Sequence, residues 1–377
     1  MTHERYHTST MMFVLTLIIL FGASPVFSQD TTGLGIQGHS WDVFLRADAN
    51  SPGDTEVMFL DLLTGESASF STAGERFTLL DNAVLYFDLS DQQIKLIKPD
   101  GHIREHPFIT KTDADYRLDW TVSKDRRQIA WSVSQRSADE QLTTTIMLAD
   151  QSGSEIRQLL VYGPRPGIRL LPVAFDANGA TLYVDVHADG AERAAPYARR
   201  SNLFALDFGG PGVATRLLPG DAPCFCAVGF GNELLLRLAP SGEPDSTQVE
   251  IYDIQSGATR VIAPVARGDF NEAGNLLLSP DDTLAVYALT RANGYRAAEQ
   301  EPRTVLVVAD LVNARQRVLG DALPALARPI VWTEDNSAVL YVLEGHDGVW
   351  KLRLEDGAMV KVADATYLGM LNESGGE

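Results

Sequence analysis

A short apolar strand entered through a polar turn recurs six times along the chain, as AVLYFDL, QIAWSVS, TLYVDVH, ELLLRLA, TLAVYAL and AVLYVLE. The copies lie 45, 52, 53, 50 and 55 residues apart when they are aligned on Tyr86, Trp131, Tyr183, Leu236, Val286 and Tyr341. A period of this size, filled with short strands, is typical of a radial β-repeat. The pattern therefore predicts an all-β fold, a β-propeller.

Each repeat holds more strands than the recurring one. Another apolar strand precedes it, with starts at Leu118, Pro172, Val228, Leu276 and Ile330. A third strand follows and ends in a hairpin turn such as Asp100-Gly101, where glycine takes the positive φ. A fourth, alternating strand closes the repeat, with starts at Glu155, Ala214, Ala258, Arg315 and Val360. Four antiparallel strands per repeat make one propeller blade.

Seven third strands occur, so we expect seven blades. The first copy begins with a second strand at Trp41 and lacks a first strand, whereas the C-terminal segment ATYLGMLN follows the last fourth strand without a partner. We expect this segment to pair with the first blade and to close the ring, which removes an exposed sheet edge. The expected boundaries are a propeller over residues 41–371, a linker over 29–40 and a polar tail over 372–377.

The turns after the first strands resemble degenerate copies of the phrase W-S-P-D-G. Examples are Phe175-Asp176-Ala177-Asn178-Gly179 and Leu278-Ser279-Pro280-Asp281-Asp282. The repeat is similar to the WD40-like (TolB-type) repeat of exported bacterial β-propellers, which also occurs in the propellers of prolyl oligopeptidase-like enzymes. The resemblance covers residues 41–371 and implies an exported propeller in the periplasm, at the cell surface or outside the cell.

The N-terminus has the pattern of a signal peptide. Residues 11–22 (MMFVLTLIILFG) form an apolar run that suits an h-region and is short for a membrane span. Small or medium residues at Val26 and Ser28 predict cleavage before Gln29, so residues 1–28 are the expected signal peptide. An uncleaved anchor is the alternative. Both predict export.

The net charge of −19 narrows the range of partners. An acidic surface repels nucleic-acid phosphates and anionic lipid, so we expect no nucleic acid as a partner. No later apolar run approaches the length of a membrane span, so we expect none after signal removal. Cys224 and Cys226 lie two residues apart, too far for easy bridging in a regular strand. A local disulfide at a bulge or turn, two buried thiols, and a metal pair remain open.

The chain carries no recognisable catalytic motif. It has no G-x-S-x-G elbow, no P-loop and no zinc spacing. His102 and His106 flank a strand, and we expect both to be solvated. Aspartates recur near the ends of third strands, at Asp61, Asp150, Asp207, Asp253 and Asp310. We expect them to cap turns; a carboxylate ring that holds a divalent cation in the channel is the alternative. Otherwise no cofactor is expected.

Four connections between second and third strands are predicted to be long polar loops on one face: residues 135–142, 187–201, 240–247 and 290–304. Long loops on a rigid scaffold are where binding usually resides. Two of them carry arginine with tyrosine, which supplies donors and stacking faces for anionic or protein ligands. The candidate contact residues are Arg193, Tyr197, Arg199, Arg200, Arg291, Tyr295 and Arg296.

These observations favour a non-catalytic extracytoplasmic binding or scaffold propeller. It is expected to be a monomer that recognises a protein or envelope polymer through the loop-bearing face. The alternatives are a propeller enzyme, a hydrolase or lyase that uses carboxylates at the channel mouth, and a metal or small-molecule sensor.

Overall fold

The computed structural model describes residues 40–191, 195–200, 202–210, 212–218, 226–243, 246–265, 270–291 and 302–372. The predicted signal peptide, residues 29–39 of the predicted linker and residues 373–377 lie outside this part. None of the described residues belongs to a helix long and apolar enough to cross a membrane.

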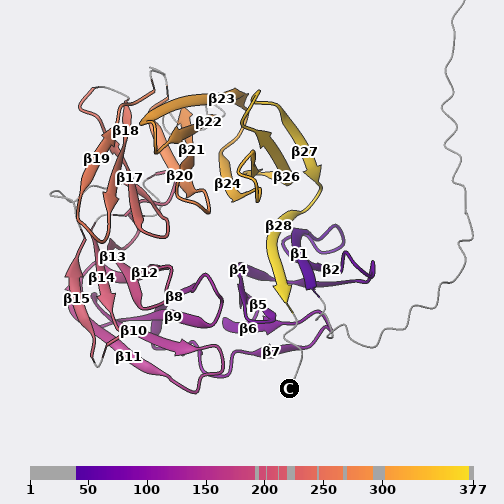
Figure 1. The fold of residues 1–377 in the computed structure, drawn as a ribbon. Helices are drawn as coiled ribbons and strands as arrows, with labels where there is room; N and C mark the ends of the chain where they lie inside the picture. The colour runs from indigo at the N-terminus through magenta and orange to yellow at the C-terminus, as the bar shows by residue number, and fades with distance from the viewer. Residues whose placement is uncertain are drawn as a thin grey trace, which may run out of the picture. The chain divides into compact units, whose positions relative to one another are not determined.

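The described chain forms seven four-stranded antiparallel sheets arranged in a ring (Figure 1). We number them as blades in chain order and give the strands of each from the channel outward. Blade 1 contains β28 (Thr366–Asn372), β1 (Ser40–Ala47), β2 (Thr55–Leu60) and β3 (Ser67–Thr72). Blade 2 contains β4 (Gly74–Leu80), β5 (Ala83–Asp88), β6 (Gln93–Ile97) and β7 (Ile103–Glu105). Blade 3 contains β8 (Asp115–Val122), β9 (Gln128–Arg136), β10 (Gln141–Asp150) and β11 (Arg157–Pro166).

The other four blades repeat this order. Blade 4 contains β12 (Ile168–Phe175), β13 (Thr181–Ala188), β14 (Leu203–Asp207) and β15 (Ala214–Leu217). Blade 5 contains β16 (Ala227–Phe230), β17 (Leu234–Pro240), β18 (Thr247–Asp253) and β19 (Thr259–Ile262). Blade 6 contains β20 (Glu272–Leu278), β21 (Leu284–Arg291), β22 (Arg303–Asp310) and β23 (Arg315–Leu323). Blade 7 contains β24 (Ala327–Trp332), β25 (Ala338–Leu343), β26 (His346–Arg353) and β27 (Met359–Ala363). The predicted all-β fold and its seven blades are confirmed.

The ring closes through the C-terminal strand, as the sequence predicted. β28 pairs antiparallel with β1, in a register that runs from Ser40 opposite Asn372 to Leu45 opposite Thr366. The Tyr367 hydroxyl donates to Asp42 Oδ1 across the same pair at 2.9 Å. The first blade is therefore built from both ends of the propeller sequence.

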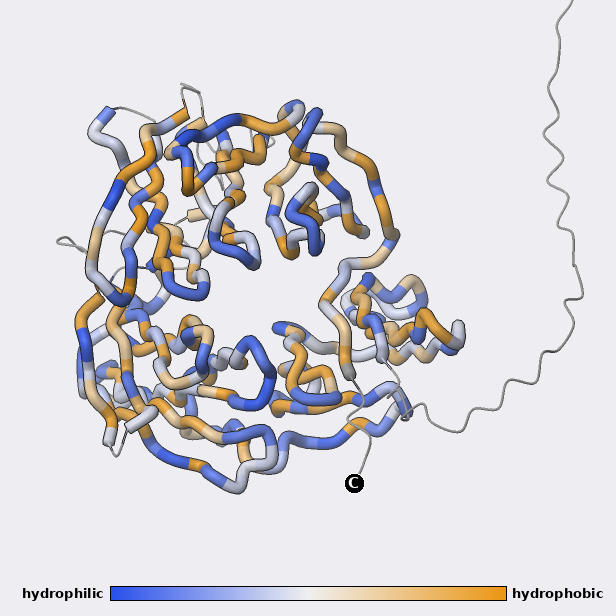
Figure 2. The backbone as a smooth tube through the Cα atoms, viewed as in Figure 1, coloured by the Kyte–Doolittle hydropathy of each residue, from blue (hydrophilic) through white to orange (hydrophobic). Residues whose placement is uncertain are grey.

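Apolar residues fill the spaces between neighbouring blades. Figure 2 shows apolar positions concentrated in the strands and polar stretches at the turns. One core cluster joins Leu85 of blade 2 to Trp131 of blade 3, and another joins Leu236 of blade 5 to Tyr287 of blade 6. Each blade thus buries its two faces against its neighbours, which is why one sheet cannot be stable alone.

Two parts of the fold differ from the sequence prediction. Residues 135–142 are not a long loop, because β9 runs to Arg136 and β10 begins at Gln141, with a four-residue turn between them. Strands β3, β4 and β7 were not recognised in the sequence, although β3 (SASFST) alternates polar and apolar residues. All three residues of β7 are exposed, so only the backbone ladder marks it as a strand.

The antiparallel order gives the ring two different ends. We call the end where first strands join second strands the turn face, and it also carries the connections from third to fourth strands. We call the other end, where second strands join third strands, the loop face. The long connections after β13, β17 and β21 all leave from the loop face.

Candidate functional site

The first strands of the blades surround the centre of the ring, and the cavities of interest lie along them. One cavity of about 370 Å³ lies at the turn face. Two others, of about 480 and 240 Å³, lie toward the loop face. Both faces of the ring therefore offer a candidate site. The residues that line the cavities differ between the two faces.

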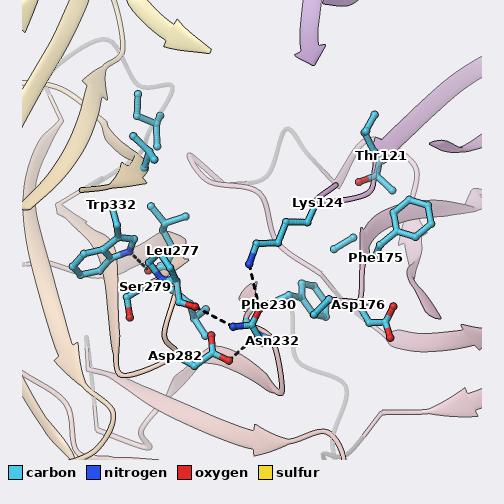
Figure 3. Close-up of a pocket in the computed structure, with 18 residues that line it drawn as sticks. Thr121, Lys124, Phe175, Asp176, Phe230, Asn232, Leu277, Ser279, Asp282 and Trp332 are labelled. Carbon is cyan, nitrogen blue, oxygen red and sulfur yellow. Dashed lines mark hydrogen bonds between the residues drawn. The ribbon is translucent and has the colours of Figure 1, made fainter. Parts of the chain in front are cut away.

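The turn-face cavity is largely apolar and is closed on one side by hydrogen bonds between blades (Figure 3). Phe175, Phe230 and Trp332 contribute aromatic surface to it. Lys124 of blade 3 donates from Nζ to Asn232 Oδ1 of blade 5 at 3.2 Å. Asn232 in turn donates from Nδ2 to the Pro280 carbonyl of blade 6 at 3.0 Å. These polar groups satisfy one another.

At the loop face, residues 195–200 form a strap that leaves blade 4 and is anchored on blades 5 and 6. Tyr197 packs in the core cluster of blades 6 and 7, and its hydroxyl bonds to the hydroxyls of Thr290 and Thr304. A Cβ on Gly274 would lie 2.2 Å from the Tyr197 Cβ, so only glycine leaves room there. The strap is thereby fixed to the rim of the ring.

The predicted contact residues lie in different structural environments. Tyr197 is 5% exposed, so it is a core residue rather than part of an exposed patch, because its ring fills the space beside Gly274. Arg199 forms an ion pair with Glu272 on β20. Arg200 pairs its backbone with Cys226 and lines the 240 Å³ cavity. Arg291 ends β21 and is half-buried. Arg193, Tyr295 and Arg296 lie outside the described residues.

The structure brings further arginines to the centre of the ring. Arg169 on β12 is 1% exposed and donates from Nη1 to Asp119 Oδ2 on β8 at 2.5 Å. Arg117 and Arg76 approach the same carboxylate at 3.3 and 3.5 Å. The Arg76 guanidinium also lies over the Trp120 ring, 3.8 Å from its centroid. Asp119 is thus shared by three cations from blades 2, 3 and 4.

Two more aspartates at this end are engaged in the same way. Asp189 Oδ2 accepts from the Tyr116 hydroxyl at 2.7 Å and from Arg136 at 3.2 Å. Asp185 is fully buried and lies 3.0 Å from His187 Nδ1. We call Asp119, Asp185 and Asp189 the channel aspartates. Asp119 and Asp189 hold the surrounding arginines in place, and Asp185 contacts the His187 ring.

Sequence reasoning missed the arginines of the first strands, Arg76, Arg117, Arg169 and Arg328. The sequence feature that could have identified them is an arginine within an otherwise apolar strand of a strongly acidic chain. Arg169 and Arg76 pair with Asp119 across blades, and local periodicity does not show such pairings.

Four of the five aspartates at the ends of third strands cap turns, and the fifth, Asp207, instead bonds to Thr181 Oγ1 and Arg216. Asp61 Oδ1 accepts from the backbone of Leu63 and Thr64, and Asp253 Oδ1 accepts from Gln255 and Ser256 in the same way. Among the described residues, no three His, Cys, Asp or Glu side chains lie close enough to hold a metal ion. Cys226 is buried and disulfide-bonded, while Cys224 lies outside the described residues.

No family model and no curated protein sequence matches the chain. Many solved structures resemble its fold, three of them as follows. An oligogalacturonate lyase in complex with manganese has a TM-score of 0.53 and 12% identity, over 90% of this chain and 99% of that one. A prolyl endopeptidase has a TM-score of 0.63 and 11% identity, over 88% of this chain and 49% of that one. The acylaminoacyl peptidase of Pyrococcus horikoshii has a TM-score of 0.50 and 12% identity, over 84% of this chain and 49% of that one.

The chain thus spans about half the length of each peptidase. At these identities the likeness shows the fold alone: the chain is a seven-bladed β-propeller.

Proposed function

We propose that the protein is a non-catalytic binding propeller of the TolB-like type that holds a protein or envelope ligand at its loop face. The observation that carries the proposal is the state of the channel aspartates. Asp119 and Asp189 are held by arginines, and Asp185 is held by His187. A general acid or base must be able to exchange a proton with a substrate. Carboxylates held by ion pairs or hydrogen bonds instead fix the shape and charge of a binding surface.

The rigidity of the loop face also supports a binding role. The strap is anchored by Tyr197 in the core and by the ion pair between Arg199 and Glu272. A surface that is fixed before the ligand arrives loses little conformational entropy on binding, which favours affinity.

Photo-crosslinking from two positions tests the proposal. A photoreactive amino acid replaces His346, an exposed residue that lines the 480 Å³ cavity at the loop face. The matched control replaces Leu62, which is 71% exposed at the turn face. We expect envelope material to crosslink from position 346, to be displaced by excess unmodified protein, and to be recovered with unchanged mass. Equal crosslinking from position 62, or a ligand cleaved during incubation, would contradict the proposal.

We further propose that the protein is exported, because of the apolar run over residues 11–22. The expected mature chain begins at Gln29. Intact-mass measurement of protein purified from the producing cell checks this. A mass that includes residues 1–28 would instead favour an uncleaved anchor.

A further inference from the structure

A cavity of about 240 Å³ lies between the strap and the first strands of blades 4 to 7. Its lining combines apolar walls with a few polar groups: Val173, Ala198, Arg200, Ala227, Val228, Asn275, Leu276, Leu277, Arg328 and Pro329. Only Arg200 and Arg328 among these are charged. They come from distant parts of the chain, the strap and β24, and only the closed ring brings them to one cavity.

Neither of these arginines is neutralised in the way the other central arginines are. Within the part of the chain that the structure describes, neither guanidinium has an ion pair or a side-chain hydrogen bond. Arg169, by contrast, binds Asp119, and Arg199 binds Glu272. Burial lowers the pKa of Arg200, although Asp185 and Asp119 oppose the change through space. The cavity thus holds two cations without a contacting anion.

Arg200 is partly buried without a contacting anion, which is costly, whereas Arg328 is exposed at the rim of the cavity. An anion that enters the cavity removes the cost at Arg200 and gains a second donor from Arg328. We propose that this cavity binds the carboxylate of a small organic acid, with Arg200 and Arg328 donating to its oxygens. Guanidinium groups match carboxylates because two parallel N–H groups meet two oxygens. The apolar walls, which include Val173, Leu276 and Pro329, suit a short hydrocarbon body. An inorganic anion has no apolar part, so it would leave those apolar walls exposed to water.

Arg200 is held in position before a ligand arrives. Its backbone N–H donates to the Cys226 carbonyl at 2.7 Å, and its carbonyl accepts from Cys226 N–H at 3.0 Å. Tyr197 and Arg199 anchor the strap on the other side. This inference rests on the proposed function and adds to it the chemistry of one ligand group.

Calorimetry and thermal shift on the whole protein test the site with three probes: hexanoate, its neutral analogue hexanamide, and inorganic phosphate. We expect millimolar hexanoate to bind saturably and to raise Tm, phosphate to bind more weakly, and hexanamide not to bind. Arg328→Gln should weaken hexanoate binding about tenfold or more, as loss of one charged hydrogen bond does. The matched control is Arg260→Gln, a change at an exposed position on β19, which should leave binding unchanged.

Arg200→Gln separates binding from a structural role. Removal of a partly buried, unneutralised charge should leave the Tm of the ligand-free protein equal or higher while hexanoate binding is lost. A lowered Tm, equal stabilisation by hexanamide, phosphate binding as tight as hexanoate binding, or full binding by Arg328→Gln would each overturn the inference. Arg328 also lines the 480 Å³ cavity beside His346, but hexanoate binding is measured without envelope material, so the proposed function can fail while hexanoate still binds.

Discussion

Burial sets the protonation of one histidine in this propeller, His106. His106 is 2% exposed, lies against the Phe108 ring, and accepts the Ile109 N–H at Nδ1. Burial, helped by Arg104, lowers its pKa to about 4. The expectation that His106 is solvated was therefore wrong, because the bend after β7 turns it inward. The neutral ring is part of the core.

His106 should make the protein sensitive to acid. Its pKa is lower in the folded state, so the unfolded chain binds the proton first, and stability falls as pH drops from about 6.5 to 4. We expect a loss of up to about 3 kcal/mol over that range. His106→Asn keeps an acceptor for Ile109 and should remove much of the loss, as measured by urea unfolding at several pH values. His102→Asn, at an exposed position, is the control. An unchanged pH dependence in His106→Asn would refute the assignment.

At the scale of elements, the blades are joined by side chains that bond to the backbone of the next blade. Asp282, in the turn after β20, accepts at Oδ2 from the backbone N–H of Asn232 at 2.7 Å and of Glu233 at 3.2 Å. A Cβ on Gly231 would lie 2.2 Å from Asp282 Oδ1, so glycine permits this approach. Trp332 Nε1 joins blade 7 to the Leu277 carbonyl of blade 6 at 3.3 Å.

Asp282→Ala should loosen the contact between blades 5 and 6. Loss of two charge-assisted bonds at a partly exposed site should lower the free energy of unfolding by about 1–2 kcal/mol. Hydrogen exchange at the Asn232 and Glu233 amides should speed up. Asp347→Ala, on an exposed residue of β26, is the control and should change neither quantity. Unaltered exchange in Asp282→Ala would mean that the carboxylate does not join the blades.

At the scale of the whole molecule, stability depends on the closed ring. β28 supplies the first strand of blade 1, and its Leu371 is buried against the cluster that contains Trp41. Arg126 of blade 3 also donates to the Met370 carbonyl. The C-terminal strand thus connects to several parts of the ring.

Deletion of residues 366–377 should open the ring. The exposed edge of β1 and the lost burial of Leu371 should lower stability by several kcal/mol and promote aggregation. Thermal unfolding and size-exclusion chromatography check this. Deletion of residues 373–377 alone spares β28 and should have no effect. A stable monomer without β28 would show that closure is dispensable.

The repeat of apolar strands and glycine turns determined the blade count, the strand order and the closure by β28, because these follow from local periodicity and from an unpaired strand at each end. The same periodicity indicates which positions are apolar, but it does not determine which side chains of different blades meet in the channel. Tertiary structure alone placed Arg169 against Asp119, buried Tyr197 beside Gly274, and brought Arg200 to the cavity of Arg328. These contacts join different blades, and Arg200 and Arg328 share a cavity because blades 4 and 7 face the same channel, so the chemistry of the site was decided by the ring.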